Sequence, residues 1–148
     1  MIGGTGPTRR AVLGTAATAL VSVAGCVSGG SAAPDPKDDY DVGMSAIAFA
    51  PDELTVPVGT TVVWKNTNSR THTVTAYEDL IPAEADYFAS GGFDSQSAAV
   101  NGYYNQLAGG IGSQETYRHT FSVPGDYRYF CVPHEQAGMT GTITVTDD

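Results

Sequence analysis

Three residues with metal-binding side chains lie close together near the end of the chain. They are Cys131, His134 and Met139, spaced as C-x2-H-x4-M. A thiolate, an imidazole and a thioether are donors that soft and borderline transition metals prefer. A lone cysteine near histidines is otherwise a candidate nucleophile or an inert buried residue. The combination of three such donors at this spacing predicts a metal site.

One further histidine would complete a set of two imidazoles and a thiolate with a weak axial thioether, which is typical of electron-transfer copper. The chain has three histidines, so His72 and His119 compete for this place. His72 follows the polar loop 66–70, where the chain enters a predicted strand, and is the better candidate. His119 lies within the predicted strand 117–123, and we expect it to be a half-buried framework residue.

Short runs rich in Val, Thr, Tyr and Phe surround these candidate ligands, and turns containing Gly or Pro separate them. This alternation is typical of an all-β sandwich. The predicted strands cover 46–49, 54–56, 60–64, 71–75, 117–123, 127–130 and 141–145. We therefore expect an all-β domain in which strand ends position the metal ligands.

The stretch 76–115 does not follow this pattern. It is far longer than an ordinary loop, so it should contain structure of its own. Within it, 95–107 includes Ala98, Ala99 and Val100 and is compatible with a short helix, although Gly102 weakens that expectation. The sequence thus predicts a long, partly helical insertion between the two metal-ligand regions.

The composition excludes one large class of partners. The chain has 148 residues, with 16 Asp and Glu against 7 Lys and Arg. This length suits one domain plus terminal segments. Nucleic acid is a poor partner for so acidic a chain, because binding to phosphates requires clustered basic residues. The acidity promotes solubility, fits a halophilic habitat, and could steer a basic redox partner.

The N-terminal residues 1–25 have the features of a targeting segment. Arg9 and Arg10 precede a modest apolar run that is too short to span a membrane, and the pair resembles a twin-arginine export motif. The string 23–26 resembles the lipobox of exported lipoproteins, which implies cleavage before Cys26 and lipidation of its sulfur. Residues 26–39 are small and polar, as in a flexible tether, and we place the folded domain at 40–148.

The two ends of the predicted sandwich resemble a known family. The segment 125–145 is similar to the C-terminal half of plastocyanin-type cupredoxins, and 58–66 is similar to their strand before the first histidine ligand. With the lipobox and the acidity, the chain most resembles the halocyanins of halophilic archaea. The resemblance implies a Greek-key β-sandwich that transfers single electrons. It also implies one blue, type 1 copper ion bound by His72, Cys131, His134 and Met139.

Two positions beside the predicted ligands bear on this resemblance. The family often has Asn directly after the first histidine, where this chain has Thr73. Thr73 can supply the same backbone N–H to the cysteine sulfur, but its shorter side chain puts the family's bond between the two ligand loops in doubt. Pro133 has no N–H, so a second donor to the sulfur is absent at that position.

The predicted role is that of an electron carrier, not an enzyme. A multicopper enzyme requires further histidines, and only His119 remains after the predicted ligands are assigned. A copper chaperone or store is the alternative, but such proteins favour pairs of exposed Cys or Met. We expect a monomer on the outer face of the cytoplasmic membrane, anchored by lipid. Redox proteins of the membrane electron-transfer chain would dock transiently near His134, since brief redox encounters use small interfaces.

Overall fold

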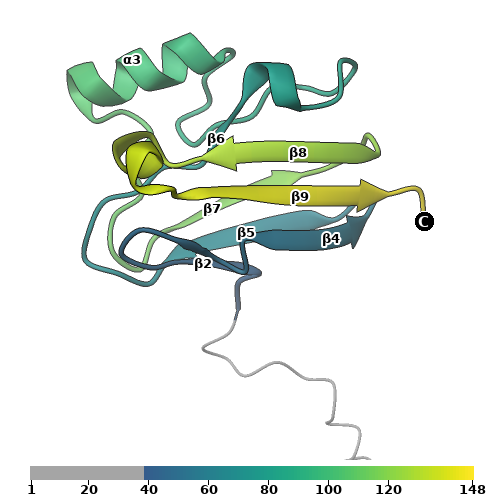
Figure 1. Cartoon of the computed structure of the whole chain (residues 1–148), viewed down its shortest axis with the longest axis horizontal. Coiled ribbons are helices and arrows are strands. Elements are labelled where there is room, and N and C mark those ends of the chain that lie inside the picture. Colours follow the sequence, from purple (N-terminus) through teal and green to yellow (C-terminus); the bar gives the residue numbers. More distant parts are fainter. Residues whose placement is uncertain (1–38) are drawn as a thin grey trace, which may run out of the picture. The chain divides into compact units, whose positions relative to one another are not determined.

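Two four-stranded β-sheets form the framework of residues 39–148, which are the part of the chain described by the structure, a computed structural model (Figure 1). The first sheet contains, in spatial order, β3 (Phe49–Ala50), β2 (Val42–Met44), β5 (Thr61–Asn66) and β7 (Thr116–Thr120). The second contains β4 (Glu53–Pro57), β9 (Thr140–Thr146), β8 (Gly125–Phe130) and β6 (Thr75–Ala76). The predicted signal segment 1–25 and Cys26 lie outside the described residues, as does the tether up to residue 38.

The strand pairing combines parallel and antiparallel neighbours. β2 runs parallel to β5 and β4 runs parallel to β9, whereas the other pairs are antiparallel. Along β9, buried and partly exposed residues alternate, which places Ile143 and Val145 in the core. Trp64 on β5 is fully buried and lies against Tyr117 of its own sheet and Tyr129 of the other. The predicted all-β sandwich is therefore confirmed.

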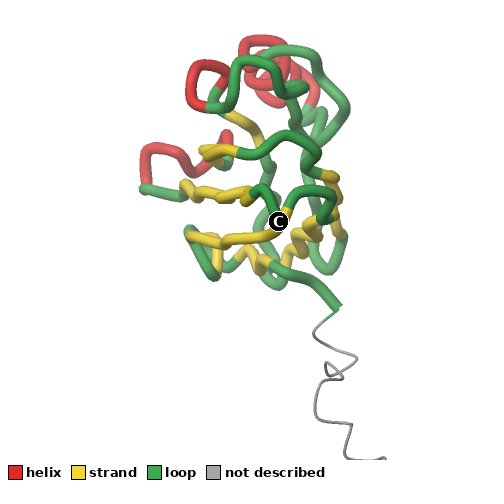
Figure 2. The backbone as a smooth tube through the Cα atoms, turned by 90° about the vertical axis from the view of Figure 1, so that its right-hand side faces the viewer, coloured by secondary structure: helices red, strands yellow, loops and turns green. Residues whose placement is uncertain are grey.

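The predicted insertion contains two helical elements, η4 (Glu78–Leu80) and α3 (Gln96–Gln106). The Ser95 hydroxyl accepts a hydrogen bond from the Ala98 N–H at 3.2 Å and caps the start of α3. Leu107 ends the helix in the left-handed conformation. The helices lie outside the two layers of strands (Figure 2), with α3 beside β6 (Figure 1). The expected partly helical insertion is thus confirmed.

Several predicted strand limits were wrong. The segment 71–75 contributes only its last residue to a strand, because its backbone bonds to the insertion instead: His72 pairs with Ile111 as an isolated bridge. The predicted strand 117–123 ends at Thr120, since the Phe121 N–H turns to the Thr60 carbonyl at 2.9 Å. β2 was not predicted. Of the predicted strand 46–49 only Phe49 belongs to a strand, β3, because a turn closed by the bond from the Ser45 N–H to the Ala48 carbonyl precedes it.

The longest helix among residues 39–148 is α3, with 11 residues. No helix in that part of the chain is long and apolar enough to cross a membrane.

Candidate metal centre

The predicted ligands converge at one end of the sandwich, where β8 leads into the short helical element η5 (Val132–Ala137) (Figure 1). The candidate ligand atoms of His72, Cys131 and His134 lie within 4.8 Å of one another. The Cys131 Sγ is 3.6 Å from the His72 Nδ1 and 3.3 Å from the His134 Nδ1. Both imidazoles therefore turn the same kind of nitrogen toward one sulfur, which is the arrangement that three ligands of a shared ion require.

Met139 belongs to the same loop as Cys131 and His134. The Cys131 N–H donates to the Met139 carbonyl at 3.1 Å, and the Met139 N–H donates to the His134 carbonyl at 3.2 Å. These bonds close the loop on itself and place Met139 next to the cysteine, where its side chain is fully buried. The side chain of Met139 is thus held in the interior by the same loop that carries Cys131 and His134.

The electrostatics of the site suit a cation. Burial, aided by repulsion from His134, lowers the pKa of His72 to about 4, and burial also lowers the pKa of His134. Both rings are therefore neutral at pH 7 and have a free lone pair. Burial raises the pKa of the Cys131 thiol to about 11, so this group holds its proton until a metal displaces it.

The backbone around the Cys131 sulfur acts against burial and lowers the pKa of the thiol. The Thr73 N–H donates to the Cys131 Sγ at 3.4 Å, and this contact and the backbone of His134 lower the thiol pKa. Both therefore favour the thiolate that a copper ion would bind. Among the described residues, the buried Nε2 of His72 has no hydrogen-bond partner, although the Ser45 backbone faces the ring and raises its pKa slightly.

Thr73 also connects the two ligand-bearing segments. Its hydroxyl accepts a hydrogen bond from the Val132 N–H at 2.8 Å and lies 3.0 Å from the hydroxyl of Thr75. The threonine side chain is thus long enough for the bond between loops that the sequence analysis left in doubt.

Pro133 occupies the first turn of η5, where a missing N–H breaks no helical bond, and the next residue, His134, donates its N–H to the Cys131 carbonyl at 3.1 Å.

Asn66 is a site residue that the sequence analysis missed. It is fully buried at the end of β5, and its Nδ2 donates to the carbonyls of Arg70 at 2.6 Å and Ile111 at 2.8 Å. Its Oδ1 accepts from the Asn68 N–H at 2.8 Å. These bonds fix the loop that leads to His72. The only signal in the sequence was a polar residue directly after an apolar strand.

His119 lies elsewhere in the molecule. It is on β7, and its ring stacks on Phe88 with the ring centroids 4.6 Å apart. It is not a member of the group formed by His72, Cys131 and His134. The structure therefore brings one of the two competing histidines to the sulfur and leaves the other against an aromatic ring.

Comparison with known proteins relates this chain to one family. The family model for copper binding proteins of the plastocyanin/azurin family matches residues 37–146. The plastocyanin minor isoform of Arabidopsis thaliana is 40% identical over 100 residues, covering 68% of this chain and 52% of that protein, so the chain spans about half of its length. Plastocyanin of Scenedesmus fuscus is 36% identical over 100 residues, covering 68% of this chain and 88% of that protein.

A solved structure and a longer alignment agree with this result. The chloroplastic plastocyanin of Oryza sativa subsp. indica is 34% identical over 139 residues, covering 92% of this chain and 80% of that protein. The fold is similar to that of the oxidised plastocyanin from Dryopteris crassirhizoma, with a TM-score of 0.50 and 25% identity. That alignment covers 71% of this chain and 98% of the fern protein.

Proposed function

The chain belongs to the plastocyanin/azurin family of copper-binding proteins, and on this premise we propose that it carries single electrons on one copper ion bound by His72, Cys131, His134 and Met139. Members of this family are electron-transfer proteins with one type 1 copper. The observation that supports the assignment most directly is the convergence of two Nδ1 atoms on one buried sulfur at 3.3 and 3.6 Å.

The protein's part in this function is to hold the ligands still and to exclude water. When bound, copper supplies a one-electron couple between Cu(I) and Cu(II), which the soft sulfur ligands and the imidazoles serve in both states. Cys131 gives up its proton on binding and keeps the Thr73 N–H as a hydrogen-bond donor to its sulfur. His72, Cys131 and Met139 are fully buried, so the site offers no open position to a substrate.

Electrons would enter and leave through His134, which is the one proposed ligand that reaches the surface. Two of the most exposed large hydrophobic side chains of residues 39–148, Tyr104 and Leu107, lie at the end of α3, each 66% exposed. The Tyr104 hydroxyl donates to the Val132 carbonyl at 3.3 Å, which ties α3 to the ligand loop. α3 has no charged residue, so a partner would meet an uncharged helix on this side of His134, while Glu135 and Arg70 are the charged residues close to the ring.

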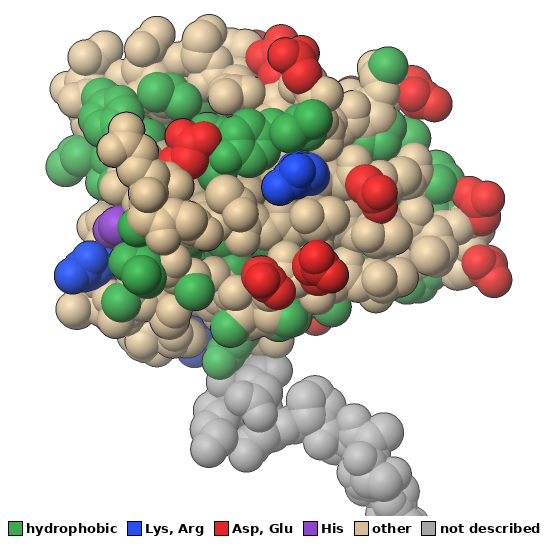
Figure 3. All heavy atoms as spheres, in the orientation of Figure 1, with side chains coloured by type: hydrophobic (Ala, Val, Ile, Leu, Met, Phe, Trp, Pro, Cys, Tyr) green, Lys and Arg blue, Asp and Glu red, His purple; other side chains and the backbone are tan. Residues whose placement is uncertain are grey.

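The distribution of charge favours this end of the molecule for docking. Figure 3 shows hydrophobic side chains gathered toward the end that carries η5, while most acidic side chains lie toward the opposite end. A small apolar surface with few charges suits the short-lived complexes of redox proteins. We therefore propose transient docking of redox proteins of a membrane electron-transfer chain at the His134 end, with the protein itself a monomer.

The test of the carrier function is a spectrum and a voltammogram of the copper-loaded chain. We expect a strong visible absorption from the bond between thiolate and Cu(II), a narrow copper hyperfine splitting in EPR, and a reversible one-electron couple. A copper chaperone or store is the alternative, and it would hand its copper rapidly to a competing chelator. Fast transfer of copper without a reversible couple would overturn the carrier function.

The place of action in the cell is a separate proposal that rests on the sequence alone. The twin-arginine motif and the lipobox ending at Cys26 support export and lipid anchoring on the outer face of the cytoplasmic membrane, as in a halocyanin-like protein. Replacing Cys26 by Ser should release the folded copper domain into the medium. If this variant stays in the membrane fraction, the lipid anchor is wrong.

A further inference from the structure

Segment 88–90 of the insertion holds the strand that follows His72. The Ser90 N–H donates to the Val74 carbonyl at 2.7 Å, and the Ala76 N–H donates to the Phe88 carbonyl at 3.1 Å. The Ser90 hydroxyl in turn accepts from the Val74 N–H at 3.1 Å. Segment 88–90 thus covers the free edge of β6, which is otherwise bonded only to β8.

Phe88 fixes this segment to the other sheet. Its side chain is 2% exposed and its ring stacks on that of His119 on β7, with an angle of 18° between the rings. Phe121 packs edge-on against both rings, at 5.3 Å from Phe88 and 4.7 Å from His119. The pair of Phe88 and His119 therefore bridges the two sheet edges β6 and β7.

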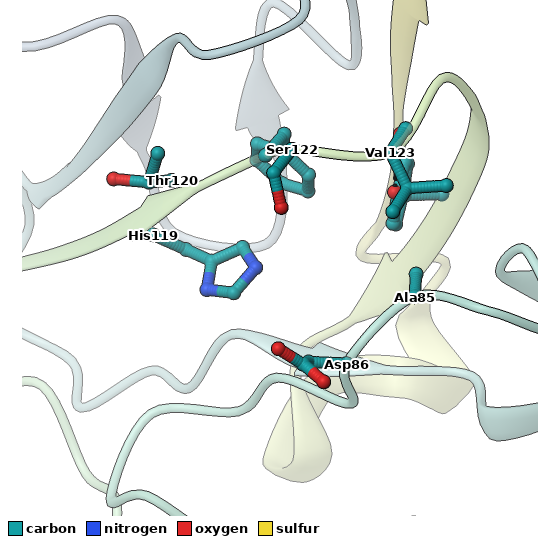
Figure 4. A pocket seen from close by; sticks show the side chains of 8 residues that line it. Ala85, Asp86, His119, Thr120, Ser122 and Val123 are labelled. Atoms are coloured by element: carbon teal, nitrogen blue, oxygen red, sulfur yellow. Dashed lines mark hydrogen bonds between the residues drawn. The ribbon is translucent and has the colours of Figure 1, made fainter.

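The outer side of the His119 ring faces a small polar cavity of about 20 Å³, large enough for one water molecule (Figure 4). Asp86 lies across this cavity with its carboxylate turned toward the imidazole (Figure 4). Between the two side chains there is no direct ion pair. A carboxylate is thus near enough to favour a charged imidazole without being bonded to it.

The other titratable groups around His119 leave Asp86 as its main electrostatic neighbour. Tyr127 on β8 lines the cavity, but its hydroxyl donates to the Val123 carbonyl and burial keeps it protonated. Asp94, Tyr87 and Tyr117 line a second hollow that His119 also lines. β5 presents only Val62 opposite His119. Glu84 acts on Tyr127 and not on the imidazole.

We propose that His119 is a positioning residue for the ligand strand: its neutral ring holds segment 88–90 against β6, and its protonation in mild acid releases that segment. This inference goes beyond electron transfer. A titratable residue outside the copper site would control how firmly segment 88–90 is bound to the residues that follow His72 and Thr73. Its effect on copper rests on the proposed function, whereas the release of segment 88–90 does not.

The direction of the pH effect on release follows from the surroundings of the His119 ring. Burial lowers the pKa of His119 and Asp86 only partly offsets this, so the stacked state disfavours the proton. The released state, with the ring in water, has the ordinary pKa of about 6.5. As the pH falls below that value the released state binds the proton more readily, and the equilibrium moves toward release.

Two substitutions should shift this pH dependence in opposite directions. His119→Phe keeps an aromatic ring on Phe88 but cannot take a proton, so release should no longer increase in acid. Asp86→Asn removes the group that favours the charged ring in the stacked state, so release in acid should increase. A residue with a purely structural role would change the stability at all pH values but would not produce opposite pH profiles.

The measurement is hydrogen exchange by mass spectrometry on the copper-loaded full chain, with peptides from the centre of β9 as the internal reference. Relative to that reference, protection of the amides of Ala76 and Ser90 should fall severalfold from about pH 7.5 to about pH 5 in the native chain. It should stay constant in His119→Phe and fall further in Asp86→Asn. If protection rises in acid, or if His119→Phe keeps the native profile, the proposal is overturned.

A second measurement follows the copper itself. The Cu(II) hyperfine splitting should change over the same pH range in the native chain and remain constant in His119→Phe, if the released segment loosens the strand after His72. An unchanged exchange profile together with a changed EPR profile would locate the pH effect at the copper ligands and would also overturn the proposal. Failure of the copper assignment itself would leave the exchange results intact.

Discussion

The copper end of the sandwich and its aromatic edge each place a histidine of the same type in a buried setting. At the copper end, the ring of His72 lies beside a sulfur and within 4.9 Å of the ring of His134, measured between centroids. At the aromatic edge, His119 lies between Phe88, Phe121 and a one-water cavity. Burial lowers the pKa of both His72 and His119, so both rings are neutral at pH 7.

The difference lies in what each neutral ring faces. At the copper end, two imidazole nitrogens face one sulfur, whose single proton can serve only one of them at a time, whereas one cation can bind all three atoms. At the aromatic edge, the ring has apolar faces against it and packs as another aromatic residue would. The comparison indicates that the copper end supplies function, and that the aromatic edge supplies the stability that keeps the ligands in place.

The largest expected effect is loss of the thiolate. Cys131→Ser removes the sulfur and should abolish the visible absorption, because a hydroxyl does not replace a thiolate as a soft ligand. His119→Gln should leave the absorption nearly unchanged at neutral pH, as the matched control from the aromatic edge. Absorption spectra after copper titration decide between them. If His119→Gln bleaches the protein while His72→Gln does not, the wrong histidine was assigned to copper.

The next effect concerns the stability supplied by the aromatic edge. Phe88→Ala leaves a cavity in the ring cluster and should lower the free energy of unfolding by about 3–5 kcal/mol. Val58→Ala, at an exposed turn position, should stay within about 0.5 kcal/mol. Urea unfolding of the copper-free protein measures both. Equal losses in the two variants would mean that the edge has no special role in stability.

A smaller effect concerns how the stability of the copper end depends on pH. In copper-free protein, His72 has a pKa of about 4 when folded and about 6.5 when unfolded, so the unfolded state binds more protons in between. The free energy of unfolding should fall by the order of 3 kcal/mol as the pH drops from about 6.5 to about 4. His72→Gln should remove most of this loss. Should the variant lose as much stability in acid as the native chain, another group is responsible.

The smallest expected effect is a change in the reduction potential of the copper, with the same four ligands. Pro133→Ala supplies an N–H that proline lacks, and a hydrogen bond to the thiolate weakens its donation to copper and favours Cu(I). The reduction potential should rise by the order of 59 mV, which is tenfold in the equilibrium of a one-electron couple. Voltammetry of the two proteins gives the answer. A broader spectrum with an unchanged or lower potential would mean that Pro133 only stiffens the loop.

The ligand loop and the sandwich could be predicted from the sequence because their signals are local. The motif from Cys131 to Met139 places three donors on one short loop, whatever the rest of the chain does. Along β9, apolar and polar residues alternate with a period of two, so the sequence itself shows which side chains face the core, and Gly and Pro mark the turns between strands. The helix α3 was recognisable only in part, since the alanines of 95–107 favour a helix and Gly102 opposes it, while the cap by Ser95 came from the structure.

The structure of segment 71–76 was not predictable in the same way. Its residue types favour a strand, yet besides the pairing of β6 with β8 its backbone bonds to Ile111, Phe88 and Ser90 of the insertion. Those partners are distant in sequence, and which of them lies opposite a given residue depends on the path of the whole insertion. The same holds for the hydrogen bond that the Thr73 hydroxyl accepts from the Val132 N–H, 59 positions away.

The sequence by itself determined the donor types, their order along the chain and the strands that end beside them. Only the tertiary structure decided which histidine meets Cys131, because His72 and His119 both belong to β-rich segments and differ in where those segments lead. His72 is brought to the sulfur by the bonds of Asn66 and Ile111, whereas pairing with β5 and the stack on Phe88 hold His119 on the edge strand β7. The physical reason is that a metal site depends on distances between side chains, and these are set by long-range packing.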